Sequence, residues 1–233
     1  MGTIAARKKG PPEMTSHLEK EIIALKEMLL TMAGHAESAV SQAIRALVER
    51  NDELARTVIA GDAVVDRLEV EIDERVITLL SMAMLATDLR LMTVAMKLSH
   101  DLERVADEAT TIARRAILLN AEPESGLTGD IPRMAEMALG TLKEALETFT
   151  NAQPGKARAI IPRDKEVDAL NKKLHRDLTD HMLEQRGSIN ACLNLMVISK
   201  SLEHIGDQAA SIAEEVVFLY EAQDIRHTGK GEA

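Results

Sequence analysis

The chain has 233 residues, a formal charge of −10, and a composition that is 45% hydrophobic and 28% charged, which is typical of a globular protein. Ala, Leu, Met, Glu, Lys and Arg dominate, whereas the sequence contains no Trp, one Tyr and two Phe, so an all-α fold is expected. The negative charge and the scarcity of aromatic side chains argue against nucleic acid and an anionic membrane surface as direct ligands.

The number of cysteines and the length of the apolar runs indicate the cellular compartment in which the protein is expected. Cys192 is the single cysteine, so an internal disulfide is excluded, which fits a reducing compartment. The first 12 residues do not have the pattern of a signal peptide, and the longest apolar run, residues 76–86, is shorter than a membrane span. We therefore expect a cytoplasmic protein that meets a membrane only through its partners.

The first half is expected to form a bundle over residues 15–121, preceded by a flexible arm at residues 1–14. The helix limits follow from apolar residues spaced three and four apart and from polar residues that interrupt this spacing. Thr15 or Ser16 is the expected cap of the first helix, with Glu19 placed as in a capping box. The three helices are expected at residues 15–50, 53–85 and 89–120, with caps at Asn51-Asp52 and Thr87-Asp88.

A Pro/Gly/Ser-rich linker at residues 122–130 is the predicted boundary between two domains. The second bundle is expected over residues 131–222, followed by a flexible tail at residues 223–233. Its three helices are expected at residues 131–151, from 156 or 162 to 184, and from about 189 to 222. The chain is therefore predicted to be two tandem three-helix bundles without strands.

The third helix of each half carries the same apolar seam. Nine apolar residues advance by alternating steps of four and three, which is the pattern of long helices packed in bundles. The second copy follows at an offset of 100 residues, so the two halves are predicted to be copies of one domain. The seams are Leu91, Ala95, Leu98, Leu102, Val105, Ala109, Ile112, Ala116 and Leu119, and Ala191, Leu195, Ile198, Leu202, Ile205, Ala209, Ile212, Val216 and Leu219.

Paired carboxylates accompany the repeat. Residues four apart share one face of a helix, and the third helices each carry one such pair, expected on their outer side. The second helices each add a pair with the spacing Asp-x-x-Val-Asp-x-Leu. The four pairs are Glu103 with Asp107, Glu203 with Asp207, Asp62 with Asp66, and Asp164 with Asp168.

Four carboxylates from two adjacent helices are suited to a hard cation or a small metal cluster. Ligation by oxygen alone favours Fe, Mn, Mg or Ca over a thiolate-seeking metal, and the sequence indicates no organic cofactor. The alternative interpretation is that each pair belongs to an ordinary solvated helix face. Four histidines on these helices do not recur between the halves, and we interpret them as exposed helical residues: His100, His175, His181 and His204.

The sequence contains no recognisable catalytic arrangement. There is no Ser/His/Asp order that stands out and no Gly-rich phosphate loop, and Cys192 lies in an apolar helical run. The acid pairs are placed outward, whereas acid–base chemistry by carboxylates requires burial that raises a pKa. A non-enzymatic protein is therefore expected.

The repeated motif resembles a known family. The segments 102–107 (Leu-Glu-Arg-Val-Ala-Asp) and 202–207 (Leu-Glu-His-Ile-Gly-Asp) are similar to the Leu-Glu-Arg-Ile-Gly-Asp signature of the PhoU family, as is the segment 61–69 to its second-helix pattern. The resemblance covers about residues 15–222. The chain departs from the signature at Ala106 and His204, and Glu108 and Gln208 replace the family's histidine, but all of the carboxylates are retained.

The resemblance implies a pseudo-twofold pair of bundles and a negative regulator of phosphate uptake and the phosphate-starvation response. It implies two kinds of partner, a phosphate-sensing histidine kinase and the ATPase of the phosphate ABC transporter, and a homodimer. It also implies surface metal sites, often rich in iron. One site would use Asp62, Asp66, Glu103 and Asp107, and the other Asp164, Asp168, Glu203 and Asp207.

Three hypotheses follow. The leading one is a cytoplasmic adaptor that binds partner proteins and represses phosphate-starvation genes. The second is a surface metal-cluster carboxylate protein, rich in iron, with a storage or redox role. The third is a purely structural helical scaffold.

Overall fold

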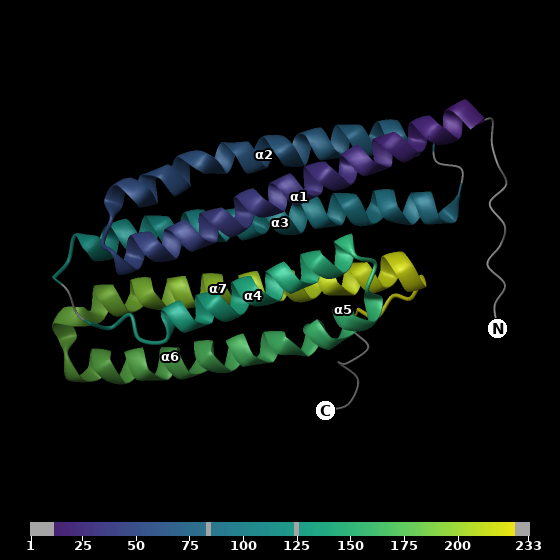
Figure 1. The fold of residues 1–233 in the computed structure, drawn as a ribbon. Helices are drawn as coiled ribbons and strands as arrows, with labels where there is room; N and C mark the ends of the chain where they lie inside the picture. Colours follow the sequence, from purple (N-terminus) through teal and green to yellow (C-terminus); the bar gives the residue numbers. More distant parts are fainter. Residues whose placement is uncertain (1–11, 83–84, 124–125, 227–233) are drawn as a thin grey trace.

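The computed structural model describes residues 12–82, 85–123 and 126–226, and all regular structure in these ranges is helical. The first half contains α1 (Pro12–Val48), α2 (Asp52–Leu80) and α3 (Ala86–Asn120). In the second half α7 (Ile189–Glu221) packs against α4 (Ile131–Thr150), the short α5 (Pro154–Ile160) and α6 (Asp164–Glu184). The helices of each half lie side by side, so the predicted fold of two tandem bundles is confirmed (Figure 1).

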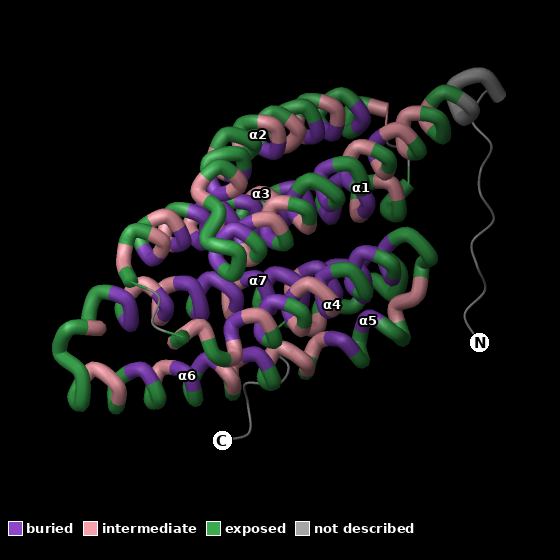
Figure 2. The backbone as a smooth tube through the Cα atoms, turned by 60° about the vertical axis from the view of Figure 1, so that its left-hand side comes forward, coloured by how far each residue is buried: buried purple, intermediate pink, exposed green. Residues whose placement is uncertain are grey.

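The predicted seams form the core of both bundles. All eighteen seam positions on α3 and α7 are buried, and none is more than 8% exposed. The buried sides of the helices face one another and the exposed sides face outward (Figure 2). The apolar side chains thus form stripes and do not surround the helices. Among the described residues, no helix combines the length and hydrophobicity needed to cross a membrane.

The two halves are joined along α3 and α7. Four polar contacts between described side chains cross this interface: Lys97 Nζ to Glu215 Oε1 at 2.8 Å, Ser211 Oγ to Asp101 Oδ2 at 3.1 Å, His204 Nδ1 to Glu108 Oε1 at 2.8 Å, and Arg115 to Asn194 Oδ1 at 3.3 Å. Partners that lie later on α3 lie earlier on α7, so the two helices are antiparallel. This arrangement is what a twofold axis between two similar halves requires.

The turn between α1 and α2 follows the sequence prediction. Asn51 caps α2, and its side-chain oxygen accepts a hydrogen bond from the Leu54 backbone N–H at 3.0 Å. Arg50 before it has a left-handed backbone with a φ of 52°. The Arg50 guanidinium donates to the Asn120 carbonyl at 2.8 Å, which ties this turn to the end of α3.

Several predicted helix limits are wrong. α1 begins at Pro12, ahead of the expected cap at Thr15 or Ser16. α2 ends at Leu80 and not at residue 85, because the Ser81 hydroxyl donates to the Thr78 carbonyl at 2.7 Å and closes the last turn. α3 begins at Ala86, so Thr87-Asp88 is no cap: the Asp88 carboxylate accepts from the Leu85 backbone N–H, at 3.3 Å, from inside the first turn.

The second half differs from the first in its middle helix. Of the two predicted starts of this helix, 156 is wrong, because α5 and α6 are separated by a 3₁₀ turn at Ile161–Arg163, whereas 162 lies two residues before the first residue of α6. Pro162 lies in that turn and has no N–H for an α-helical hydrogen bond. The predicted arm at 1–14, linker at 122–130 and tail at 223–233 lie partly outside the described residues.

Candidate metal centre

The structure gathers the predicted carboxylates into two groups, one on each bundle. In the first half the α2 pair faces the α3 pair; we call Asp62, Asp66, Glu103 and Asp107 the first cluster. In the second half the α6 pair faces the α7 pair; we call Asp164, Asp168, Glu203 and Asp207 the second cluster. Asp107 and Asp207 are exposed as expected, whereas Glu103 and Glu203 are half-buried, which the outward prediction did not include.

Glu103 is the most perturbed carboxyl of the first cluster. Its pKa is raised to about 7, first by burial and then by the charges of Asp107 and Glu69, while His100 opposes them. A hydrogen bond with the Asp107 carboxyl also favours the protonated form. The side chain is 21% exposed, so solvent screens these charges only in part. Glu103 therefore binds either a proton or another cation readily.

Asp62 connects the two helices of the first cluster. Burial raises its pKa, and so do the negative charges of Asp66 and Asp107. A hydrogen bond from Thr110 and the positive charge of Arg114 act in the opposite direction. Asp62 is thus close enough to Asp66 and Asp107, and Glu103 to Asp107, for the carboxylates to repel one another, which is an arrangement that a bound cation stabilises.

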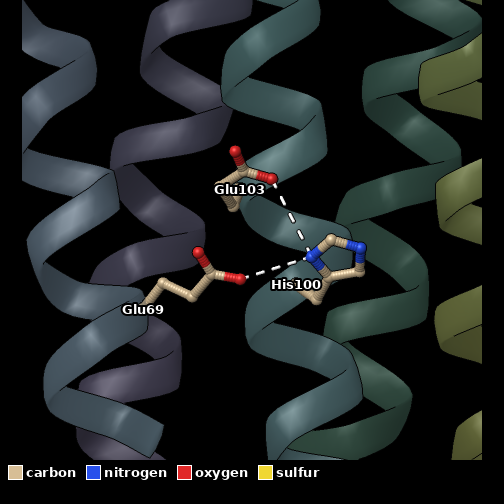
Figure 3. A group of neighbouring side chains, drawn as sticks. All are labelled: Glu69, His100 and Glu103. Atoms are coloured by element: carbon tan, nitrogen blue, oxygen red, sulfur yellow. Dashed lines mark hydrogen bonds and ion pairs between the residues drawn. The ribbon is translucent and has the colours of Figure 1, made fainter.

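Two further residues complete the first cluster, and sequence reasoning missed both. One oxygen of Glu69, one oxygen of Glu103 and a ring nitrogen of His100 lie within 4.8 Å of one another (Figure 3). His100 Nδ1 is 3.3 Å from Glu69 Oε1 and 4.0 Å from Glu103 Oε2. His100 is exposed, as interpreted, but it also contacts both carboxylates. The sequence signal that could have placed these residues in the cluster was their spacing: His100 lies three residues before Glu103, and Glu69 lies three after Asp66.

The second cluster has the same carboxylates in a tighter group. Burial raises the pKa of Asp168, and the charge of Glu203 and a hydrogen bond with it add to the effect. Burial also raises the pKa of Asp207, helped by the charges of Glu203 and Asp168. Asp164 lies one turn before Asp168 and makes only a small contribution there. Three of the four predicted residues therefore meet closely.

The second cluster has lysine side chains in contact with its carboxylates. The Lys200 ammonium contacts Glu203 directly, and Lys172 Nζ is 3.9 Å from Asp168 Oδ2. Lys200 occupies the position that His100 has in the first copy. Asn171 replaces Glu69, and its side-chain oxygen is buried and accepts from Ser199 Oγ at 2.5 Å. The second cluster is therefore partly neutralised by residues of the protein itself.

The remaining histidines have other roles. His204, where the family signature has Arg, reaches across the interface to Glu108 and has its other ring nitrogen 4.0 Å from Glu203 Oε2. The His175 ring lies 3.3 Å from the Met196 carbonyl, away from the carboxylates. The interpretation of His204 as a simply exposed residue is therefore wrong, because it joins α7 to α3. It is also wrong for His175 and His181, which are only partly exposed.

The donor atoms of the first cluster fit a divalent metal. Carboxylate oxygens suit Fe, Mn and Mg, and the added imidazole nitrogen favours Fe among them; no thiolate is available, because Cys192 is buried elsewhere on α7. The mutual repulsion of Asp62, Glu103 and Asp107 is the observation that favours a cation here. The second cluster fits less well, because Lys200 already supplies a positive charge.

Comparison with known proteins identifies the family. The family model described as the PhoU domain matches the chain twice, over residues 29–116 and 131–216. The chain belongs to the PhoU family. It is 37% identical to the phosphate-specific transport system accessory protein PhoU homolog of Caulobacter vibrioides, over 91% of this chain and 95% of that one. It is 30% identical to the Escherichia coli protein of the same description, over 94% and 91%.

Solved PhoU structures have the same fold. The crystal structure of PhoU from Pseudomonas aeruginosa matches with a TM-score of 0.85 and 34% identity, over 88% of this chain and 99% of that one. The PhoU structure from Streptococcus pneumoniae matches with a TM-score of 0.82 at 24% identity, which supports the fold alone. Each of the two PhoU-domain matches contains one of the two clusters.

Proposed function

We propose that the chain is a non-enzymatic regulator of phosphate uptake that represses the phosphate-starvation response when phosphate is plentiful. The observation that carries this proposal is the double PhoU-domain match, together with relatives described as accessory proteins of a phosphate-specific transport system. The regulator acts in the cytoplasm on a phosphate-sensing histidine kinase, on the ATPase of the phosphate ABC transporter, or on both. It works as a homodimer.

The surface of the molecule supports a binding role. Its net charge is −10, and carboxylates lie in clusters on both bundles. Such a surface attracts basic partners and raises their rate of association. The long helices are held by a continuous buried core, so the carboxylates are presented on rigid elements.

A metal belongs to the proposal. Fe, Mn or Mg binds the eight predicted carboxylates, more tightly at the first cluster, where Glu69 and His100 add donors. The bound ion supplies positive charge that cancels the repulsion among the carboxylates and changes the local charge of the docking surface. His100 and Glu69 orient toward Glu103 and complete the donor set (Figure 3).

The regulatory role is tested by deleting the gene in its host. Deletion is expected to raise phosphate-regulated expression in phosphate-rich medium, and the wild-type gene on a plasmid restores repression. Unchanged expression in the deletion strain would refute the regulatory proposal. Purified wild-type protein is expected to sediment as a dimer, and a monomer at micromolar concentration would refute that part alone.

A second candidate is a surface metal-cluster protein with a storage or redox role, favoured by the Glu69, His100 and Glu103 donor set. Elemental analysis of protein purified without chelators, with Glu103→Ala and Glu203→Ala beside it, tests the metal. If the wild-type protein contains no metal above background, both the metal part of our proposal and this second candidate are refuted. If metal is bound but the protein has no redox turnover, the regulatory proposal stands and the second candidate is refuted.

A further inference from the structure

An apolar patch lies beside the first cluster, at the end of the α2–α3 hairpin. Two of its side chains, Val70 and Ile77, are 57% and 63% exposed, which is high for β-branched aliphatic residues on a well-packed helix. We call the following exposed residues the hairpin patch: Val70, Ile77 and Leu80 of α2, Leu85 before α3, and Leu89 and Met96 of α3.

The hairpin patch continues the helix faces that carry the carboxylates. On α2, Val70 and Ile77 follow Asp66 at steps of four and seven, and on α3, Leu89 and Met96 precede Glu103 at steps of seven. These steps keep side chains on one face of a helix. The contact between Glu69 and His100, at 3.3 Å, brings the two faces together.

The surface is therefore divided lengthwise into an acidic part and an apolar part. α2 and α3 run side by side toward their connection, so the apolar part lies between the first cluster and the hairpin end (Figure 1). The nearby Arg75 is directed to the other side of α2, where it pairs with Glu21 of α1 at 2.7 Å. No lysine in the described ranges pairs with the carboxylates beside the patch in the way that Lys200 pairs with Glu203 in the second cluster.

The second half shows that the fold does not require the α2 part of this patch, although Ile189, at the position of Leu89, is exposed there as well. The helix positions that correspond to Val70 and Ile77, at the offset set by Asp66 and Asp168, are Lys172 and Thr179. Lys172 lies beside Asp168 and contributes a positive charge. The same bundle position thus accepts polar residues, so packing within the bundle does not explain the exposed aliphatic residues of the first half.

We propose that the hairpin patch and the first cluster together dock an amphipathic helix of a partner protein, with Lys or Arg over the carboxylates and aliphatic side chains over the patch. This inference rests on the proposed function in one respect, that a regulator contacts a protein partner. Helix-in-groove recognition uses such spacings of apolar anchors. The stretch from Asp66 to Leu80 extends about 20 Å, which matches a partner helix of about four turns.

Charge selects this occupant over two others. A second copy docked through the same surface would bring two acidic clusters together, and an anionic membrane would be repelled by them. A basic helix gains from both parts of the surface. The occupant is therefore a partner with opposite charge and a matching apolar stripe.

The test uses a fluorescein-labelled amphipathic helical peptide of Leu and Lys, with its lysines concentrated in the first two turns, and fluorescence anisotropy in buffer containing a chelator. The variant is Val70→Lys combined with Ile77→Thr, the residues that the second half carries at these positions. The matched control is Leu193→Lys combined with Leu183→Thr, exposed residues of the second half. Circular dichroism verifies that both fold.

We expect the patch variant to weaken peptide binding at least tenfold and the control variant to bind like wild type. A peptide with Glu in place of Lys is expected not to bind. Equal binding by both variants would overturn the proposal. So would loss of dimer, or loss of binding to anionic vesicles, in the patch variant alone, since each identifies a different occupant.

Expression of the patch variant in the deletion strain separates this inference from the proposed function. Loss of repression with the patch variant, but not with the control, supports docking at the patch. If deletion raises the expression of phosphate-regulated genes and the patch variant fully restores their repression, the proposed docking surface is refuted and the regulatory proposal stands. If deletion changes nothing, the regulatory proposal fails, and the peptide measurement alone decides the patch.

Discussion

Asp101 is a buried carboxylate in the interface between the halves. It is 8% exposed and accepts one hydrogen bond from Ser211, at 3.1 Å. Burial raises its pKa to about 6, and the negative charge of Glu215 adds to this, while Ser211 and the charges of His100 and Arg104 oppose it. The folded protein thus holds a proton on Asp101 more tightly than the unfolded chain does.

The raised pKa predicts the effect of Asp101→Asn on stability. The stabilisation that the protonated Asp101 gives the folded state is fully present below the ordinary pKa of about 4. It is lost as the pH rises through about 6, the pKa of Asp101 in the folded protein. The asparagine variant keeps an acceptor for Ser211 and has no charge to bury. We expect it to be more stable than wild type by about 2 kcal/mol at pH 7.5, with a much smaller difference at pH 4.5.

Thermal unfolding of both proteins at the two pH values, in chelator, measures this difference. Ser211→Ala is the companion variant, because it leaves the carboxylate buried without its hydrogen bond and should lower stability most at pH 7.5. An Asn variant that is less stable than wild type at both pH values would contradict the prediction.

Lys200 is the residue that sets the second cluster apart from the first. Its ammonium contacts Glu203, so Lys200→Gln removes a built-in positive charge from the carboxylates. We expect the variant to bind Mn²⁺ at the second cluster roughly tenfold more tightly, because a cation no longer meets a like charge nearby. Calorimetric titration measures the affinity. Lys173→Gln is the control, since Lys173 pairs with Asp130 at 2.7 Å, and an equal gain there would argue against the explanation.

The sequence predicts the carboxylates of the site better than their surroundings. Glu103, Asp107 and their copies recur at a fixed offset, so the repeat itself identifies them. Glu69 and His100 do not recur, because the second half has Asn171 and Lys200 instead, and repetition therefore gave no signal for them. Their contact with Glu103 depends on the register between α2 and α3, which only the packed bundle fixes.

At the scale of the helix, Gly206 is a weak point in α7. A Cβ added there would lie 3.7 Å from Val167 of α6, which is ordinary van der Waals contact. The corresponding residue of α3 is Ala106, which is 2% exposed. We expect Gly206→Ala to stabilise the protein by about 0.5–1 kcal/mol through helix propensity.

Urea unfolding measures this gain, with Gly61→Ala of α2 as the matched control. A Cβ at Gly61 meets nothing within 4 Å, so that variant reports propensity without new packing. The two gains should agree within about 0.5 kcal/mol. A destabilised Gly206→Ala would mean that α6 and α7 approach too closely at this point for a methyl group.

The helices were predictable because their signals are local and repeated. The seam of α3 and α7 alternates steps of four and three over nine residues, and every one of those positions is buried. The short α5 was not predicted as a separate helix, although Pro162 is compatible with the first turn of a new one and was one of the two expected starts. The end of α2 at Leu80 was missed because apolar residues continue past it.

For the whole molecule, the interface between the halves contains a deeply buried carboxylate that pairs with a half-buried lysine. Glu215 is 4% exposed and pairs with Lys97 at 2.8 Å, and Arg226 approaches the same oxygen at 3.7 Å. We expect Lys97→Met to destabilise the protein by about 3 kcal/mol, because it leaves the buried carboxylate with a single distant partner. Both halves should still unfold in one transition, since they share the α3–α7 contact.

Chemical denaturation followed by circular dichroism measures both the loss and the number of transitions. Arg163→Met is the control, because the Arg163–Glu144 pair is 2.7 Å long but exposed, and its loss should cost less than about 1 kcal/mol. Equal losses for the two variants would show that burial of Glu215 adds nothing. Two separate transitions would show that the halves fold independently.

The replacement of Val70 and Ile77 by Lys172 and Thr179 in the second half has a consequence for stoichiometry. A duplicated chain with two equivalent docking surfaces would bind two partner helices, one on each half, and either half could bind first. Here only the first half carries this aliphatic pair on its middle helix, so each chain is expected to take one partner in a single orientation. The two halves of a pseudosymmetric molecule are thereby non-equivalent in binding. Titration with the helical peptide should saturate at one equivalent per chain.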